Sequence, residues 1–191
     1  MAVKTFTSEQ LTSADTNTYL ANSGLVYTGQ ATAAAGSTTL SLDNCFNSTY
    51  TNYVVVYNIS GYGAGPLYMR LRTGSGDDSA ANYAWARNYF RWDGGAWGGT
   101  GSMADTVWTV GYCGGSVTTI ENNVNIFNPN VAERTSYNTN LVEISTAITN
   151  SYNMIANGQK QSITQFTGLS LIRSGALTFG GTVTVYGYRK G

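Results

Sequence analysis

The sequence predicts an all-β fold, a single antiparallel, jelly-roll-like β-sandwich over residues 25–191, preceded by an N-terminal anchor segment, residues 1–24. Three observations lead to it. The 14 tyrosines and many β-branched residues suit a pleated, half-buried surface. From Leu25 onward, hydrophobic residues recur with a period of two, which indicates strands. The 23 glycines are typical of tight turns between short strands.

The N-terminal segment carries the helical signal of the chain. Thr12 or Ser13 can cap a helix, Asp15 favours its first turn, and Gly24 lies where the helix would end. We therefore expect a short helix at about residues 13–22. A helix of about ten residues is unstable alone, so it should pack on another protein. The candidate anchor contacts are the apolar side chains of the whole segment, namely Val3, Phe6, Leu11, Tyr19 and Leu20.

About eight or nine short strands are expected after this segment. The alternation over residues 53–59 predicts a central strand that is buried on both faces. The run over residues 67–72 is one-sided and places Arg70 and Arg72 on an exposed or interfacial face. Further strands are expected at residues 83–92, 106–113, 124–127, 141–147, 152–156, 168–172 and 182–188. The glycine-dense residues 93–101 read as a loop.

The composition argues against catalysis. The chain has no histidine, so it lacks an imidazole base, a histidine-activated nucleophile and a histidine-ligated metal. A polysaccharide depolymerase would need two facing carboxylates, and ordinary turns explain most of the acidic residues. We expect no enzyme and no catalytic residues. The mid-chain carboxylates that such an enzyme could use are Asp77, Asp78, Asp93, Asp105 and Glu121.

Metals, cofactors, nucleic acid and membranes are also not expected. Asp77 and Asp78 could offer oxygen ligands to Ca²⁺, but no further acidic residues lie nearby, and a solvated turn explains them as well. The formal net charge of zero gives no field that would attract nucleic acid or an anionic membrane. No apolar stretch approaches the roughly 20 residues of a membrane span. Cys45 and Cys113 are expected to be separate buried thiols.

Residues 83–97 combine aromatic rings with arginines. Flat aromatic faces beside hydrogen-bonding groups can hold a sugar ring or another protein chain. Alternatively, some rings belong to the core with arginines stacked on them, which we expect for Trp85 or Trp92, whichever faces inward. The candidate exposed ligand or partner contacts are Arg87, Tyr89, Arg91 and Trp97.

Several stretches resemble small structural proteins of tailed bacteriophages, particularly phages of aquatic bacteria such as cyanophages. The stretch LTSADTNTYLANSGLVY, residues 11–27, is similar to their N-terminal segment, and GTVTVYGYR, residues 181–189, to their last strand. The order of YVVVYNISG, LYMRLRTGSGDDSAANYAW and LSLIRSGALTFGGTVTVYGYR between them also fits. The resemblance implies a virion component with a β-sandwich body that usually works as a trimer on the particle exterior, and it supplies no catalytic residues.

The function expected from these observations is that of a non-enzymatic virion structural protein, a compact exterior module of tail-fibre or adhesin type. A capsid decoration (cement) protein is the first alternative, and a stand-alone carbohydrate-binding module is the second. The expected partners are further copies in a homotrimer, other tail or capsid proteins, and a host surface glycan or protein. The N-terminus lacks the apolar core of a signal peptide. We therefore expect synthesis in the host bacterial cytoplasm and a final place on the virion exterior.

Overall fold

Thirteen strands make up the regular structure of the described chain, and every strand pairing is antiparallel. The computed structural model describes residues 24–62, 65–74, 76–91, 97–113, 119–143, 152–173, 175 and 177–188. The strands are β1 (Leu25–Ser37), β2 (Thr39–Leu42), β3 (Asn52–Tyr62), β4 (Gly65–Thr73), β5 (Gly76–Asp77), β6 (Tyr83–Arg91), β7 (Trp97–Asp105), β8 (Trp108–Cys113), β9 (Ile120–Phe127), β10 (Ser136–Glu143), β11 (Tyr152–Lys160), β12 (Gly168–Arg173) and β13 (Thr178–Tyr188).

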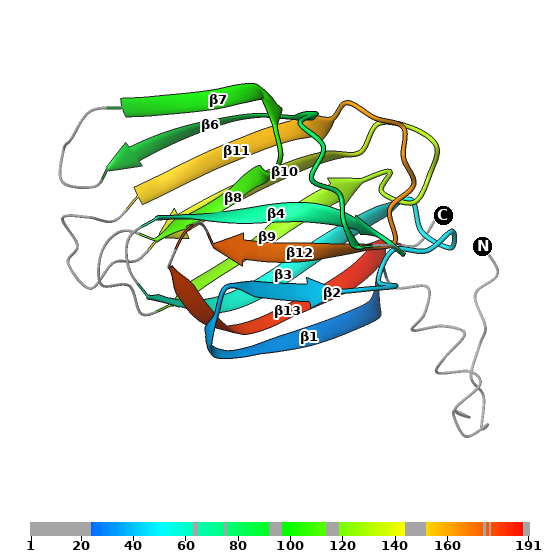
Figure 1. Ribbon diagram of the computed structural model, residues 1–191, viewed down its shortest axis with the longest axis horizontal. Coiled ribbons are helices and arrows are strands. Elements are labelled where there is room, and N and C mark those ends of the chain that lie inside the picture. The colour runs from blue at the N-terminus through cyan, green and yellow to red at the C-terminus, as the bar shows by residue number, and fades with distance from the viewer. Residues whose placement is uncertain are drawn as a thin grey trace, which may run out of the picture.

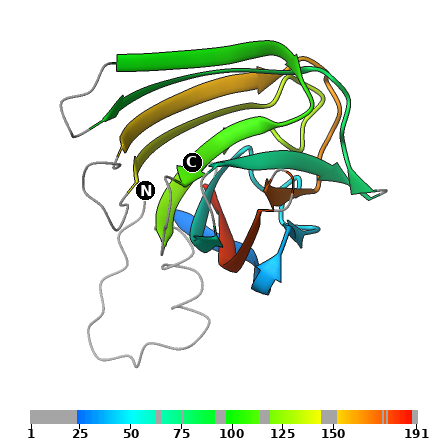
Figure 2. The same cartoon turned by 60° about the vertical axis from the view of Figure 1, so that its left-hand side comes forward.

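The strands form two sheets of unequal size (Figure 1). The large sheet has eight strands in the order β1-β13-β3-β9-β10-β11-β6-β7. The small sheet has the order β2-β12-β4-β5, with β8 also paired to β4. Figure 2 shows the large sheet curving over the small one. The predicted all-β antiparallel sandwich is confirmed, with more strands than the eight of a simple jelly roll. The predicted helix and its five anchor contacts lie outside the described residues.

The core fills the space between the two sheets. Strand β3 contributes four buried residues, Tyr53, Val55, Tyr57 and Ile59, from the face that we call the inner face of the large sheet. Strand β4 contributes Leu67, Met69 and Leu71 from the small sheet, all of them 0% exposed. Each such side chain stabilises the fold by about 1.5–3 kcal/mol relative to an exposed one. The one-sided pattern predicted for residues 67–72 is therefore confirmed.

Three expectations about the strands were wrong. The outer face of β3 is not buried throughout, because Val56 is 42% exposed and Asn58 is exposed. Most of the stretch expected as a loop forms the edge strand β7. The chain has more strands than the eight or nine expected. The four that no expected stretch covered are β1, β2, β5 and β7, which all lie at sheet edges, and of which β2 and β5 are short and β7 is glycine-rich.

The glycines of β7 are explained by their cross-strand partners. Tyr89 lies opposite Gly98, and a Cβ atom on Gly98 would come within 2.2 Å of the Tyr89 ring. The backbone of Gly101 also lies against Trp85 and Ala86 of β6. A sequence rich in glycine indicates a turn when it is read alone. Here it permits a strand to pass beneath large side chains of its neighbour.

Two tyrosines of the large sheet support β8, which is an edge strand of the small sheet. The hydroxyl of Tyr137 donates to the carbonyl oxygen of Thr109 at 2.8 Å, and that of Tyr57 donates to Val110 at 2.8 Å. Both acceptor residues are buried, so water cannot replace these hydrogen bonds. The register between β4 and β8 shifts at Val110, and this leaves its carbonyl group available to the tyrosine.

We expect Tyr137→Phe to lower the free energy of unfolding by roughly 1–3 kcal/mol, because it leaves a buried carbonyl group without its donor. Urea denaturation of the two proteins measures the difference. Tyr188→Phe is the matched control, because its hydroxyl binds Asn125 on the exposed outer face and its loss should change stability by less than about 0.5 kcal/mol. Equal midpoints for Tyr137→Phe and the parent would show that this bond does not support β8.

Alkaline pH is expected to destabilise the fold. Burial raises the pKa of the Cys45 thiol to about 12 and also raises the pKa values of Tyr83 and Tyr137. Unfolded cysteine and tyrosine lose their protons near pH 8.5 and 10, about their ordinary pKa values. The unfolded chain therefore binds fewer protons above pH 8.5, and stability falls as pH rises. Cys45 alone should contribute about 1.4 kcal/mol per pH unit between about pH 8.5 and 12.

Urea midpoints between pH 8 and 11 check this expectation. Cys45→Ala should lessen the decline that begins near pH 9. A midpoint that stays constant up to pH 11 would contradict the burial of these protonated groups.

Candidate functional site

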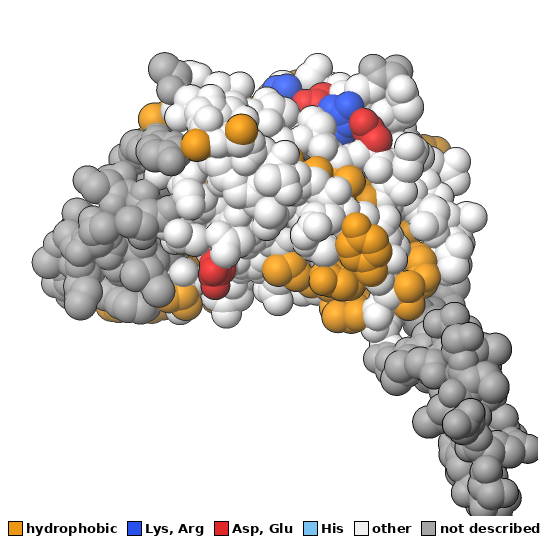
Figure 3. Space-filling model, turned by 90° about the horizontal axis from the view of Figure 1, so that it is seen from below, with side chains coloured by type: hydrophobic (Ala, Val, Ile, Leu, Met, Phe, Trp, Pro, Cys, Tyr) orange, Lys and Arg blue, Asp and Glu red, His pale blue; other side chains and the backbone are white. Residues whose placement is uncertain are grey.

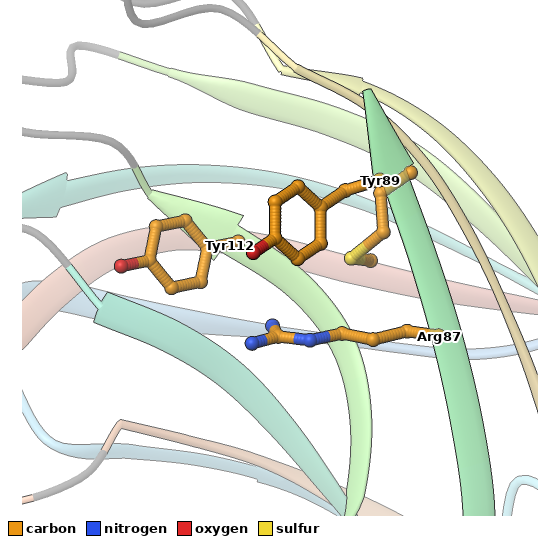
Figure 4. Close-up of a pocket in the computed structure, with 4 residues that line it drawn as sticks. Arg87, Tyr89 and Tyr112 are labelled. Atoms are coloured by element: carbon orange, nitrogen blue, oxygen red, sulfur yellow. The ribbon is translucent and has the colours of Figure 1, made fainter. Parts of the chain in front are cut away.

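A pocket of about 110 Å³ lies between the inner face of the large sheet and β8. It is lined by Arg87 and Tyr89 of β6, Met154 of β11 and Tyr112 of β8. Figure 4 shows the Arg87 guanidinium extending alongside the two tyrosine rings, with the Tyr89 side chain directed toward Tyr112. The pocket has room for several water molecules, since one needs about 10–15 Å³, or for one small chemical group.

Strand alternation places the arginine beside the aromatic rings. Residues two apart on β6 face the same side of the sheet, so Trp85, Arg87 and Tyr89 all lie on its inner face. Trp85 packs against the core and donates from its indole nitrogen to Asp105 at 3.0 Å. The expectation that Trp85 or Trp92 faces inward therefore holds for Trp85, and Trp92 lies outside the described residues.

Arg87 is surrounded by rings rather than by acids. Its guanidinium carbon lies 5.3 Å from the ring centre of Tyr112, 5.9 Å from that of Tyr89 and 6.0 Å from that of Trp85. Such contacts stabilise a cation by about 0.5–2 kcal/mol. The Nε atom is buried and has no hydrogen-bond partner. Within the described ranges, no carboxylate forms an ion pair with this arginine.

The structure separates the four predicted contacts. Arg87 and Tyr89 lie together in the pocket. Trp97, which is 77% exposed, pairs with Phe90 of β6, and their ring centres are 5.2 Å apart. Phe90 alternates with Tyr89, so Trp97 lies on the outer face of the sheet. Arg91 ends β6, and its side chain lies outside the described residues.

Sequence reasoning missed Tyr112 and Met154. Each lies in a stretch that was expected to be a strand, and both residue types are as common in a core as in a site. Their place in the pocket depends on β8 lying across β6 and β11, which are distant in sequence. No local pattern could have predicted that arrangement.

The paired aspartates are occupied by protein cations. Arg72 forms ion pairs with Asp77 and, at 2.7 Å, with Asp43. The Lys160 ammonium lies 3.2 Å from an Asp78 oxygen. These contacts account for the two carboxylates without a Ca²⁺ ion. Among the described residues, no group of three or more acidic or cysteine side chains could hold a metal.

The other described mid-chain carboxylates belong to separate structural contacts. Asp105 accepts hydrogen bonds from Trp85 and, at 2.6 Å, from the amide of Thr106. Glu121 accepts one at 2.6 Å from the side chain of Asn58 on the outer face. Asp93 lies outside the described residues. Cys45 is buried and free, as expected, and the side chain of Cys113 is not described.

Hydrophobic side chains also gather on the outer face at the β1 edge of the large sheet. Leu25 pairs with Tyr188, and Tyr27 pairs with Tyr186, whose ring centre is 6.2 Å away. Val56 lies on the same face of β3. Figure 3 views the molecule from the β1 side and shows hydrophobic side chains collected in one area. We call Leu25, Tyr27, Val56, Tyr186 and Tyr188 the outer patch.

A second, shallower hollow of about 520 Å³ lies farther along the outer face. Small residues of β6 and β11, such as Ala84, Ala86 and Gly158, form part of it, with Met103 and Phe127 also in its lining. Its lining contains no charged side chain. It therefore lacks the electrostatic character of the Arg87 pocket.

No known protein family, curated protein or solved structure matches this chain. Within the described residues, no helix is long and apolar enough to cross a membrane.

Proposed function

We propose that this protein is a non-enzymatic structural component of a tailed-phage virion, an exterior module of tail-fibre or adhesin type. In this proposal the Arg87 pocket binds an anionic group of a host surface molecule. The observation that carries the proposal is an arginine held inside an aromatic pocket with a buried, unpartnered Nε atom. The sequence resemblance described above supplies the virion context.

The chemistry of the pocket favours a carboxylate attached to a sugar. Guanidinium presents a planar fork of donors that matches a carboxylate group, and no described acidic residue already uses it. The rings of Tyr89 and Tyr112 offer flat faces to a sugar ring. A volume of about 110 Å³ accepts one such group at the end of a larger molecule. A host glycan that carries uronic or sialic acid units therefore suits the pocket.

The sheet edges favour assembly. Both edge strands of the large sheet are long, with 13 residues in β1 and nine in β7. Neither strand contains lysine, arginine or proline, the residues with which many proteins block edge pairing. The outer patch adjoins β1, and the zero net charge gives copies little reason to repel one another. We propose that further copies cover this patch in a homotrimer.

The same unblocked edges support a capsid decoration protein as the second candidate. A decoration protein stabilises the shell by burying surface across several subunits, which requires extensive lateral contacts. The two candidates differ in where the protein lies on the parent particle. Density at the tail in a cryo-electron microscopy map would support the adhesin, and density over the capsid surface would support decoration.

Arg87→Ala is expected to weaken binding to glycans with uronic or sialic acid units by about 10- to 100-fold. The basis is the loss of a charged hydrogen bond worth about 1.5–3 kcal/mol. A glycan array that includes carboxyl-reduced counterparts measures this loss. Arg134→Ala, at an exposed position, is the matched control and should bind as the parent does.

The Arg87→Ala variant should fold and lose at most about 2 kcal/mol of unfolding free energy, because the half-buried arginine gives up only its contacts with aromatic rings. Equal binding of acidic and carboxyl-reduced glycans by the parent would reject the anion-binding role. A large loss of stability in Arg87→Ala would indicate instead that the arginine supports the fold.

Tyr27→Lys is expected to convert the proposed trimer into monomers, because it places a charge in the centre of the outer patch. Light scattering coupled to size-exclusion chromatography measures the mass against the 20.4 kDa chain. Tyr27 is 60% exposed, so the fold itself should be little affected. A parent protein that remains a single 20.4 kDa species at micromolar concentration would contradict self-association.

A further inference from the structure

Lys160 is the most deeply buried cation that the structure describes. It ends β11 on the inner face of the large sheet and pairs with Tyr83 of β6. Its side chain is 0% exposed, and its ammonium nitrogen lies 3.6 Å from the ring centre of Tyr83. A buried lysine is costly unless its surroundings compensate for the lost water. The role of Lys160 must therefore be inferred from the groups that surround its ammonium.

Two polar side chains, those of Asn82 and Asp78, contact the Lys160 ammonium. The Nζ atom donates to the carboxamide oxygen of Asn82 and lies 3.2 Å from Oδ2 of Asp78. The other oxygen of Asp78, Oδ1, accepts a hydrogen bond from the Ala80 amide at 2.9 Å. The amine thus lies within reach of both a carboxamide and a carboxylate, and the lysine side chain is itself shielded from water.

The backbone fixes this arrangement from both sides. The Gln161 amide donates to the Asn82 carbonyl oxygen at 2.9 Å, and the Asn82 amide donates to Ala80 at 2.8 Å. On the other side, the Lys160 amide donates to Thr135 at 2.7 Å. Because both partners belong to ordered backbone, their reacting groups stay together without further loss of entropy.

We propose that Lys160 and Asn82 become joined by an isopeptide bond, with Asp78 as the acid–base group that promotes it. A simple ion pair would require the lysine and the aspartate alone. The added carboxamide, placed against the amine nitrogen beside a carboxylate, completes the set of groups that amide exchange needs. This inference concerns the sandwich itself and does not depend on the proposed virion role.

The reaction balances without any further reagent. The Lys160 ammonium transfers a proton to Asp78, and the free Nζ electron pair attacks the side-chain carbon Cγ of Asn82. Asp78 then passes its proton to the Asn82 nitrogen Nδ2 as the Cγ–Nδ2 bond breaks. The leaving nitrogen takes the second proton of the amine, so an ammonium ion departs and Asp78 is again a carboxylate. The product is a secondary amide between Nζ and Cγ.

The electrostatics of the site favour the nucleophile. Burial lowers the pKa of Lys160, because the charged form loses its water, while the hydrogen bond from the ammonium to Asp78 opposes this change. A lowered pKa increases the fraction of neutral amine. The Lys160 side chain is 0% exposed and its ammonium lies against the Tyr83 ring, so water has little access to the amine.

The wild-type, full-length protein provides the decisive test. We expect its intact mass to be lower than that of its sequence by one molecule of ammonia. Trypsin should leave the bond between Lys160 and Gln161 uncut, and peptide mapping should find residues 73–87 joined to residues 135–173. A separate, unmodified peptide that ends at Lys160 would overturn the proposal. Loss of ammonia without a joined peptide, as succinimide formation at an asparagine would give, would also overturn it.

Variants of the two adjacent aspartates test the role of Asp78. Asp78→Asn should retain the full sequence mass, because the proton carrier is lost. Asp77→Asn is the matched control, since Asp77 pairs with Arg72, and this variant should still lose ammonia. Lys160→Arg and Asn82→Ala should both abolish the joined peptide. Joined peptides in Asp78→Asn would overturn the role of Asp78, and the wild-type map decides the bond itself even if a variant fails to fold.

Discussion

The inner face of the eight-stranded sheet must be shielded from water, yet the sheet that packs on it is narrower. Strand β2 of the small sheet lies against β1 and β13, and β8 lies against β9 and β10 and reaches β11 and β6. The inner side chains of β6 beyond that edge are only half-buried. Arg87 and Tyr89 lie at this margin, so the pocket is a consequence of the unequal width of the two sheets.

Strand β8 is an edge strand that is buried inside the protein. Its unpaired backbone groups need hydrogen-bond partners that a neighbouring strand would otherwise provide. Tyrosine supplies them here because its ring spans the apolar layer and its hydroxyl reaches the carbonyl groups of β8. Tyr83 does the same for β4, where its hydroxyl accepts from the Leu71 amide at 3.0 Å. This explains why a core between two sheets contains so many tyrosines: each satisfies a buried polar group as well as filling volume.

The sequence predicted strands well where polar and hydrophobic residues alternate strongly. It predicted poorly those features that depend on which strands pair with one another. Strands β3, β4 and β6 were predictable because their hydrophobic residues recur with a period of two. Strand β7 was not, since its glycines reflect the Tyr89 ring over Gly98 and the close β6 backbone beside Gly101. Arg87 and Tyr89 were predicted as contacts because arginines and aromatic residues are concentrated at residues 83–97. That Trp97 lies on the opposite face of the sheet could be known only from the register between β6 and β7. Tyr112 belongs to the site because β8 lies across β6 and β11. Local sequence does not encode this packing of one sheet on the other.

Arg87 differs from Arg72 and Lys160 in its partners, and this difference bears on whether each cation supports the fold or binds a ligand. Arg72 has two aspartate partners, and Lys160 has Asp78 and Asn82, so both positions are explained within the fold. Arg87 has rings around it and no described acidic partner. On the inner face of the large sheet, Lys160 is paired with a carboxylate, whereas Arg87 is not paired with any that the structure describes. The missing partner is thus a reason to assign Arg87 to a ligand rather than to the core.

The two sites are connected through a single strand. Asn82 directly precedes β6, Tyr83 is its first residue, and Arg87 and Tyr89 lie farther along it. The proposed bond would tie the start of β6 to the end of β11, 78 positions away in sequence. Strand β6 lies next to the glycine-rich edge strand β7. A covalent link at that point would hold the strand that carries the pocket in register with β11, the strand that supplies Met154, when a bound ligand is pulled.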